Sequence, residues 1–177
     1  ATVAIGNFDG VHRGHRALIR EAKTEARAKR VPSAVMVFEP HPREFFHPNE
    51  VQFRLTTLKR KLAIFEKLGL DLVFVEPFDA ELAALTAEAF IERVLVAGLG
   101  ASHVVVGYDF YFGHNRGGNP ELMVRAGDDL GFGVTVMPPI AEDGEVFSST
   151  AVRLRLAQGD VKGVTHMLGE PWRVLGR

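Results

Sequence analysis

The chain has 177 residues, no cysteine and a formal net charge of −1 at pH 7. This length suits one domain with a substantial core. With 46% hydrophobic and 24% charged residues, the composition is typical of a soluble globular protein. The near-neutral charge argues against a nucleic-acid or membrane partner. The lack of cysteine excludes disulfides and thiolate chemistry and fits a cytoplasmic protein.

Short apolar segments alternate with helical patterns along the chain. Strands are expected at residues 2–5, 33–38, 72–75, 103–107 and 133–137. Helices are expected at 14–30, from Thr56 or Thr57 to Gly69, and at 86–96, 120–131, 148–153 and 160–168. Residues 39–46, with prolines at 40 and 42, are expected to form a loop. The alternation predicts an α/β fold with a parallel sheet and helices on both faces.

The first apolar segment runs into a glycine-punctuated stretch, Gly6-Asn7-Phe8-Asp9-Gly10-Val11-His12-Arg13-Gly14-His15. A strand, a turn and a helix N-terminus in succession present unpaired backbone N–H groups to a ligand. His12 and His15, three residues apart with Gly14 between them, are expected on one face of the first helical turn. This arrangement predicts a phosphate site. Zinc is not favoured, because no third His or Cys lies nearby.

Asn7 and Asp9 lie in the turn itself. Both residue types favour turns because their side chains bond to the local backbone. Contact with a ligand or with Mg²⁺ is the alternative, and the sequence leaves both interpretations open.

Three further unusual loops follow predicted strands, where ligands bind in open α/β sheets. They span residues 39–50, 107–118 and 148–153. Each has an ordinary interpretation too, as loop packing, as core or as a helix cap. Their candidate residues are His41, Phe46, Gly107, Asp109, Phe112, Arg116, Ser148, Ser149, Thr150 and Arg153.

These loops offer donors for phosphate and no evident covalent nucleophile. Phosphoryl or nucleotidyl transfer by positioning and electrostatics fits such an inventory best. The chain lacks Gly-x-x-x-x-Gly-Lys-Ser/Thr and therefore is not a P-loop protein.

The stretch 6–15 resembles the H-x-G-H signature of the nucleotidylyltransferase superfamily, in the narrower form G-N-F-D-G-V-H-x-G-H. Together with residues 38–42, 106–113 and 148–153 in this order, it resembles the adenylyltransferase module of prokaryotic bifunctional FAD synthetase. The likeness runs from residue 2 to about 170. It implies a Rossmann-like fold and transfer of AMP from ATP to FMN, giving FAD and pyrophosphate, with Mg²⁺ held mainly by the ATP phosphates.

The resemblance also implies roles for residues. His12 and His15 would bind the ATP phosphates and stabilise the transition state, while Ser149, Thr150 and Arg153 would form a second phosphate-binding motif. The pair His114-Asn115 departs from a commoner glycine-containing pair of the family. The residues expected to bind substrates are Gly6, Asn7, Phe8, Asp9, Gly14, His41, Phe46, Gly107, Asp109, Phe112, Arg116 and Ser148.

The family likeness predicts an adenylyltransferase domain at residues 1–170. Residues 171–177 are expected to begin a linker to a C-terminal riboflavin kinase module absent from this chain, so riboflavin phosphorylation is not expected. Two alternatives remain: another H-x-G-H nucleotidylyltransferase with a different phosphate acceptor, and a non-catalytic module that binds flavin nucleotides.

Overall fold

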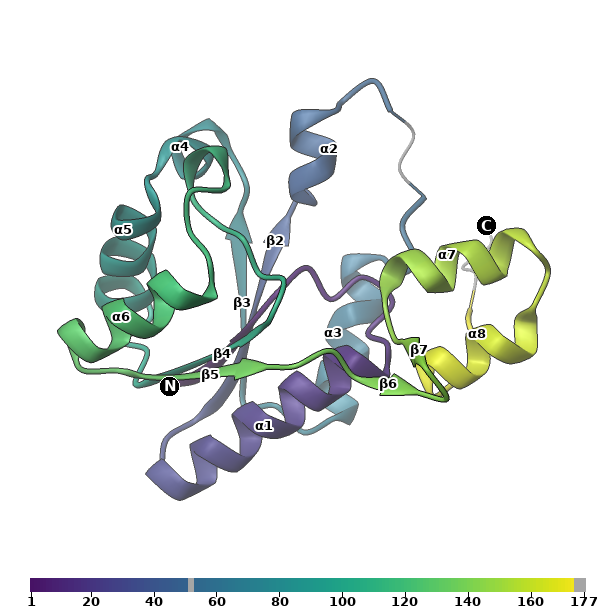
Figure 1. Ribbon diagram of the computed structural model, residues 1–177, viewed down its shortest axis with the longest axis horizontal. Helices are drawn as coiled ribbons and strands as arrows, with labels where there is room; N and C mark the ends of the chain where they lie inside the picture. The colour runs from purple at the N-terminus through teal and green to yellow at the C-terminus, as the bar shows by residue number, and fades with distance from the viewer. Residues whose placement is uncertain (51–52, 174–177) are drawn as a thin grey trace.

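A five-stranded parallel sheet forms the centre of the computed structural model, which describes residues 1–50 and 53–173 (Figure 1). Its strands are β1 (Thr2–Ile5), β2 (Ser33–Glu39), β3 (Leu72–Pro77), β4 (His103–Gly107) and β5 (Gly133–Met137). Their order is β3-β2-β1-β4-β5, and each neighbouring pair is parallel. The predicted Rossmann-like α/β class is confirmed.

The helices lie between the strands and after the last of them. The longer ones are α1 (Arg13–Lys29), α3 (Leu58–Lys67), α6 (Pro120–Leu130), α7 (Ser149–Ala157) and α8 (Val161–Leu168). The shorter ones are α2 (Pro42–Phe46), α4 (Ala80–Ala84) and α5 (Ala87–Ala89), and α5 continues as the π-helix η1 (Phe90–Gly98). A 3₁₀ turn, η2 (His114–Arg116), and a hairpin of β6 (Ala141–Glu142) and β7 (Glu145–Val146) complete the elements.

The sheet is buried on both faces, which explains why β1, β2 and β4 read as unbroken apolar runs. On one face Ile5 packs in a cluster with residues of η1 and α6, including Leu95 and Met123. On the other face Ala4 packs with Ile19 of α1 and Phe65 of α3. A third cluster joins α7 and α8 to the loop before α3.

Side-chain caps place the helix starts where the sequence predicts them. The Thr57 hydroxyl accepts from the Arg60 N–H at 3.3 Å at the start of α3. The Asn119 side chain accepts from the Leu122 N–H at 2.8 Å at the start of α6. These caps satisfy N–H groups that have no partner inside the helix.

The loop prediction for residues 39–46 is wrong at its end, because Pro42–Phe46 form the short helix α2. Pro42 stands in its first turn, where a proline ring suits the helical φ and the missing N–H is not needed. The sequence prediction also omits α4 and the β6–β7 hairpin. Elements of two to five residues carry too little periodicity to be distinguished from turns.

The strand order fixes where a ligand can enter the sheet. The chain passes from β1 to β2 and β3 on one side, and β4 then pairs with the opposite edge of β1. Connections after β1 and β4 therefore diverge, which leaves a crevice at their carboxyl ends. None of the helices within residues 1–50 and 53–173 combines the length and apolarity needed to cross a bilayer.

Candidate active site

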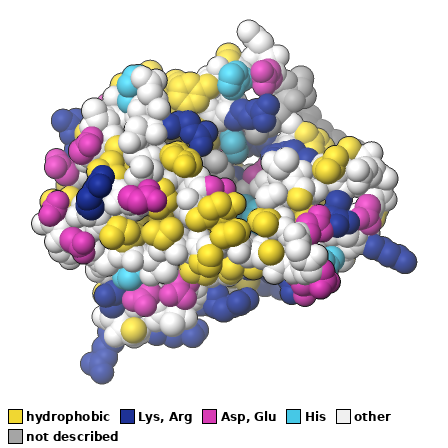
Figure 2. Space-filling view, viewed as in Figure 1, with side chains coloured by type: hydrophobic (Ala, Val, Ile, Leu, Met, Phe, Trp, Pro, Cys, Tyr) yellow, Lys and Arg dark blue, Asp and Glu magenta, His cyan; other side chains and the backbone are white. Residues whose placement is uncertain are grey.

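A cavity of about 1100 Å³ opens at this crevice. Its volume lies just above the roughly 300–1,000 Å³ range of small-molecule pockets. Figure 2 shows the surface hollowed in this region, with histidine and basic side chains around the hollow. All four predicted loops meet here, and every predicted site residue except Phe8 lines the cavity: Gly6, Asn7, Asp9, His12, Gly14, His15, His41, Phe46, Gly107, Asp109, Phe112, Arg116, Ser148, Ser149, Thr150 and Arg153.

Phe8 lies beneath the cavity and not in its wall. Its side chain is fully buried. The ring centroid lies 5.1 Å from that of His15 and 5.6 Å from that of Phe65. Phe8 therefore supports His15 from the core, and its predicted contact with substrate stays a prediction.

His12 and His15 lie side by side at the N-terminus of α1. The Nδ1 atom of His12 caps the helix by accepting from the backbone N–H of His15 at 3.3 Å. The two rings stack with centroids 3.6 Å apart. Because Nδ1 is an acceptor, a neutral His12 carries its proton on Nε2.

Gly14 makes this close arrangement possible. A Cβ atom at Gly14 would lie 3.1 Å from the His12 ring and 3.2 Å from the Phe147 carbonyl oxygen. Both contacts are tighter than those of an ordinary side chain, so a glycine allows α1, the His12 ring and the Phe147 backbone to approach one another.

Burial keeps both histidines neutral at pH 7. It lowers the pKa of His12 to about 4, and the negative charge of Asp9 only partly counteracts it. Burial also lowers the pKa of His15 well below its usual value, and nearby His12 and Lys61 lower it further. The pair therefore offers neutral N–H donors and not two cations.

Asp9 is the most extensively bonded side chain of the turn, and it is only 3% exposed. Its carboxylate accepts from the backbone N–H groups of Leu55 at 3.1 Å and Thr56 at 3.0 Å, and from the Thr56 hydroxyl at 3.2 Å. It also pairs with the guanidinium of Arg153. These bonds give Asp9 a structural role, but with segments distant in sequence and not with the local backbone. Its contact with a ligand or with Mg²⁺ stays a prediction.

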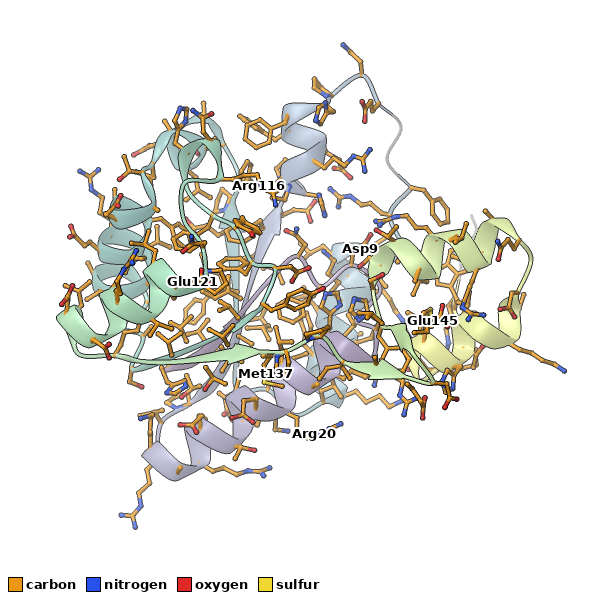
Figure 3. The ribbon with its side chains drawn as sticks, viewed as in Figure 1. Asp9, Arg20, Arg116, Glu121, Met137 and Glu145 are labelled. Carbon is orange, nitrogen blue, oxygen red and sulfur yellow. The ribbon has the colours of Figure 1, made fainter. Side chains whose placement is uncertain are left out.

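The same turn is attached to α7. The Ser149 hydroxyl donates to the Asp9 carbonyl oxygen at 2.8 Å, and Figure 3 shows Asp9 beside the start of α7. Ser148 caps α7 by accepting from the Ala151 N–H at 3.1 Å. Arg153 also donates from Nε to the Phe53 carbonyl oxygen at 3.0 Å. The predicted second phosphate motif thus faces the first across one hydrogen-bonded junction.

Arg116 borders the cavity on the side away from α7 (Figure 3). Its guanidinium carbon lies 5.0 Å from the centroid of the Tyr111 ring. Asn115 and Arg116 both adopt left-handed backbone conformations, with φ of 52° and 57°. The departure at His114-Asn115 is thus accommodated by an unusual turn that places Arg116 at the cavity.

α2 contributes an aromatic wall beside a fixed histidine. His41 caps α2 by accepting at Nδ1 from the Arg43 N–H at 3.1 Å, and burial lowers its pKa. Phe46 is 58% exposed, and its ring centroid lies 5.7 Å from that of Phe78, nearly edge-on. An exposed aromatic side chain of this kind can stack on the planar ring of a ligand.

Sequence reasoning missed several residues at or near the cavity. Phe78, Tyr108, Tyr111 and Phe147 line it, and Lys61 is a buried charge on α3. A signal for Lys61 exists, since it lies three residues after Leu58 and four before Phe65, on the inward face of the helix. Tyr108 and Tyr111 lie within the quoted motif at 106–113 but were not singled out there. Phe78 follows a predicted strand and Phe147 precedes a predicted helix, and both lie outside the quoted motifs.

A model of the FAD synthetase family matches residues 1–151. The chain belongs to this family. The resemblance seen in the four motifs is therefore confirmed.

Bifunctional riboflavin kinase/FMN adenylyltransferase from Escherichia coli (strain K12) is 43% identical over 175 residues, which cover 99% of this chain and 56% of that protein. The chain thus spans about half the length of the curated relatives that it matches.

Two solved structures share the fold. One, described as a macrolide-efflux protein from Streptococcus pneumoniae, superposes with a TM-score of 0.86 at 27% identity over 97% of this chain and 56% of that one. The other, a pantoate-beta-alanine ligase from Francisella tularensis, gives a TM-score of 0.57 at 17% identity over 93% of this chain and 69% of that one. The second likeness concerns the fold alone.

Asp9→Asn is expected to destabilise the protein by about 3–5 kcal/mol. The substitution leaves Arg153 without its buried carboxylate partner, and it places an NH₂ group, itself a donor, where backbone N–H donors need an acceptor. Asp109→Asn is the matched control, since Asp109 lines the same cavity but is exposed. Urea denaturation measures both. Equal free energies of unfolding for the two variants would contradict the role given to the Asp9 network.

Acid is expected to destabilise the protein through His12. An unfolded chain protonates this ring near pH 6.5, whereas the folded protein does so near pH 4. The unfolded state therefore binds more protons between these values, so stability is lost as the pH falls through them. His12→Asn retains a capping acceptor that does not titrate. It should remove about 2 kcal/mol of the loss between pH 7 and pH 4.5.

The measurement is urea denaturation of both proteins at the two pH values. An identical loss in the wild type and in His12→Asn would show that the His12 ring is not held neutral by the fold.

Proposed function

We propose that this chain transfers the AMP group of ATP to FMN, releasing FAD and pyrophosphate. The observation that carries the proposal is the stacked, neutral pair His12 and His15 at the N-terminus of α1, in the same cavity as the start of α7. Membership of the FAD synthetase family supports FMN as the acceptor.

In the proposed reaction, an oxygen of the FMN phosphate attacks the α-phosphorus of ATP. The bond from this phosphorus to the oxygen bridging to the β-phosphate breaks, and its electron pair leaves with pyrophosphate. Charge therefore grows on the leaving group as the bond lengthens. In this proposal the N–H donors of His12, of His15 and of the first turn of α1 stabilise that charge.

The two ends of the cavity suit the two ends of the substrates. Ser149, Thr150 and Arg153 bring hydroxyls, a guanidinium and the N-terminus of α7 to the phosphate end. His41 at the start of α2 and Phe46 on α2, with Phe78, would provide an aromatic surface for the isoalloxazine ring. Arg116, on the side away from α7, is proposed to contact polar groups of the substrates.

In this proposal magnesium enters the site with ATP and is held mainly by the ATP phosphates. Within the part of the chain that the structure describes, no group of three or more His, Cys, Asp or Glu side chains could hold a metal ion. The Asp9 carboxylate is engaged by backbone amides and by Arg153. Magnesium bound to the ATP phosphate oxygens would neutralise part of their charge.

We further propose that the protein acts in the cytoplasm and that residues 1–170 form the adenylyltransferase domain. In the full-length protein, a riboflavin kinase module would follow, as the names and lengths of the relatives suggest. Trp172, which lies in the predicted linker, donates from its indole N–H to the Leu55 carbonyl oxygen at 2.9 Å. This residue therefore still contacts the proposed domain. Residues 174–177 lie outside the described residues.

The direct test incubates the protein with ATP, FMN and MgCl₂ and measures FAD by chromatography. FAD formation is expected. Parallel reactions with pantetheine phosphate and with nicotinamide mononucleotide test the alternative acceptors. Folded protein that adenylylates another acceptor and not FMN would refute the proposal, and binding of FMN without any transfer would favour the non-catalytic alternative.

His15→Ala is expected to lower kcat for FAD formation by roughly one to three orders of magnitude, as for the loss of one transition-state donor. His166→Ala serves as the control, because this exposed histidine pairs with Glu142 away from the cavity lining. Steady-state assays give kcat for both. Wild-type turnover in His15→Ala would contradict the role given to that ring.

A further inference from the structure

Lys61 is a charged side chain in a place that favours apolar ones. It is 2% exposed and lies on α3 beside Ile64 and Phe65, which belong to the core. Burying an ammonium group costs several kcal/mol unless it gains specific partners. What Lys61 contacts therefore indicates what it is for.

The ammonium of Lys61 donates to the backbone carbonyl oxygen of Asn7 at 2.9 Å. Asn7 lines the cavity, whereas Lys61 does not. Lys61 thus holds the glycine-rich turn without itself lining the cavity.

This bond fixes the direction of the next amide. In a planar trans peptide the N–H of Phe8 points opposite to the carbonyl of Asn7, and hence away from Lys61. No residue in the described ranges 1–50 and 53–173 accepts a hydrogen bond from the Phe8 N–H. Phe8 has a left-handed φ of 49°, a conformation that a non-glycine residue keeps only when its surroundings impose it.

The following carbonyls of the turn are also engaged by donors of the protein. The Phe8 carbonyl accepts from the Val11 N–H at 3.2 Å, and the Asp9 carbonyl accepts from the Ser149 hydroxyl at 2.8 Å. A turn whose carbonyls are engaged elsewhere leaves N–H groups free to form an anion-binding concavity. Lys61 is the only charged donor among these three.

We propose that Lys61 is a positioning residue for adenylyl transfer: it orients the Asn7–Phe8 peptide so that the Phe8 N–H donates to the phosphates of ATP and to the departing pyrophosphate. This inference rests on the proposed function. Lys61 does not line the cavity, so in this proposal it acts through the backbone of the turn.

A purely structural role for Lys61 is the rival interpretation. Asp9 and Glu39 lie close enough to counteract the effect of burial, which lowers the pKa of Lys61, and the Oε2 atom of Glu39 is buried without a hydrogen-bond partner among the described residues. Lys61 could thus simply balance carboxylates. That rival predicts a loss of stability on removing the charge, whereas positioning predicts a loss of turnover.

The test compares Lys61→Met with Lys23→Met. Lys23 also donates from its ammonium to a backbone carbonyl, that of Leu68, but lies outside the cavity lining. We expect Lys61→Met to stay folded, with kcat for FAD formation lowered roughly 10- to 100-fold and KM for FMN unchanged. Lys23→Met should keep wild-type kcat, and Lys61→Arg, which retains a donor, should recover part of the loss.

A second readout does not need FMN. In ¹⁵N-labelled protein, added pyrophosphate should shift the Phe8 amide resonance in the wild type and in Lys23→Met but not in Lys61→Met. If Lys61→Met does not fold, Lys61→Gln, whose amide is too short to reach Asn7, replaces it in both measurements.

The outcomes separate the two proposals. An unchanged Phe8 response or an unchanged kcat in the folded Lys61 variant would overturn the positioning role. A loss of stability with the Phe8 response intact would favour the structural rival. Wild-type protein that makes no FAD, but whose Phe8 amide responds to pyrophosphate only when Lys61 is present, would refute the proposed function and support the positioning role.

Discussion

The carboxylate of Asp9 joins three parts of the chain that are distant in sequence. Its partners Leu55 and Arg153 lie 46 and 144 residues further along the chain. Through these bonds the turn after β1, the loop before α3 and helix α7 become one unit, and the ends of α1 and α7 face each other across the cavity. The predicted site residues of the turn and of α7 depend on this junction for their relative positions. A buried carboxylate with this many donors also explains why the turn keeps its unusual backbone shape.

Features set by local sequence could be predicted well. The apolar runs of β1, β2 and β4 follow from burial on both faces, and the caps Thr57 and Asn119 follow from the chemistry of helix ends. The edge of the sheet that carries the site follows from the parallel arrangement alone. Short elements such as α2 and the β6–β7 hairpin carry too little pattern, so they could not be predicted in this way.

Features set by contacts between distant segments were not predictable from local patterns. The motif marks Asp9 as a site residue, but only the fold shows that its bonds are directed to the protein. Phe8 belongs to the same motif and lies in the core under His15. Lys61 belongs to no motif, yet it bonds to the backbone of the turn. A signature therefore identifies a segment, while the role of each residue depends on which way its side chain or peptide points.

The neutrality of the histidine pair also bears on how the product leaves the proposed site. The departing pyrophosphate gains negative charge on the oxygen that bridged it to the α-phosphorus, and a cluster of fixed cations would hold it strongly. Stacked neutral imidazoles and backbone amides bind through local dipoles, whose attraction falls off quickly as the anion moves away. The α1 end of the cavity can thus stabilise charge while the bond breaks without becoming a trap for the product. Such a site should also be less sensitive to ionic strength than one built from lysines and arginines.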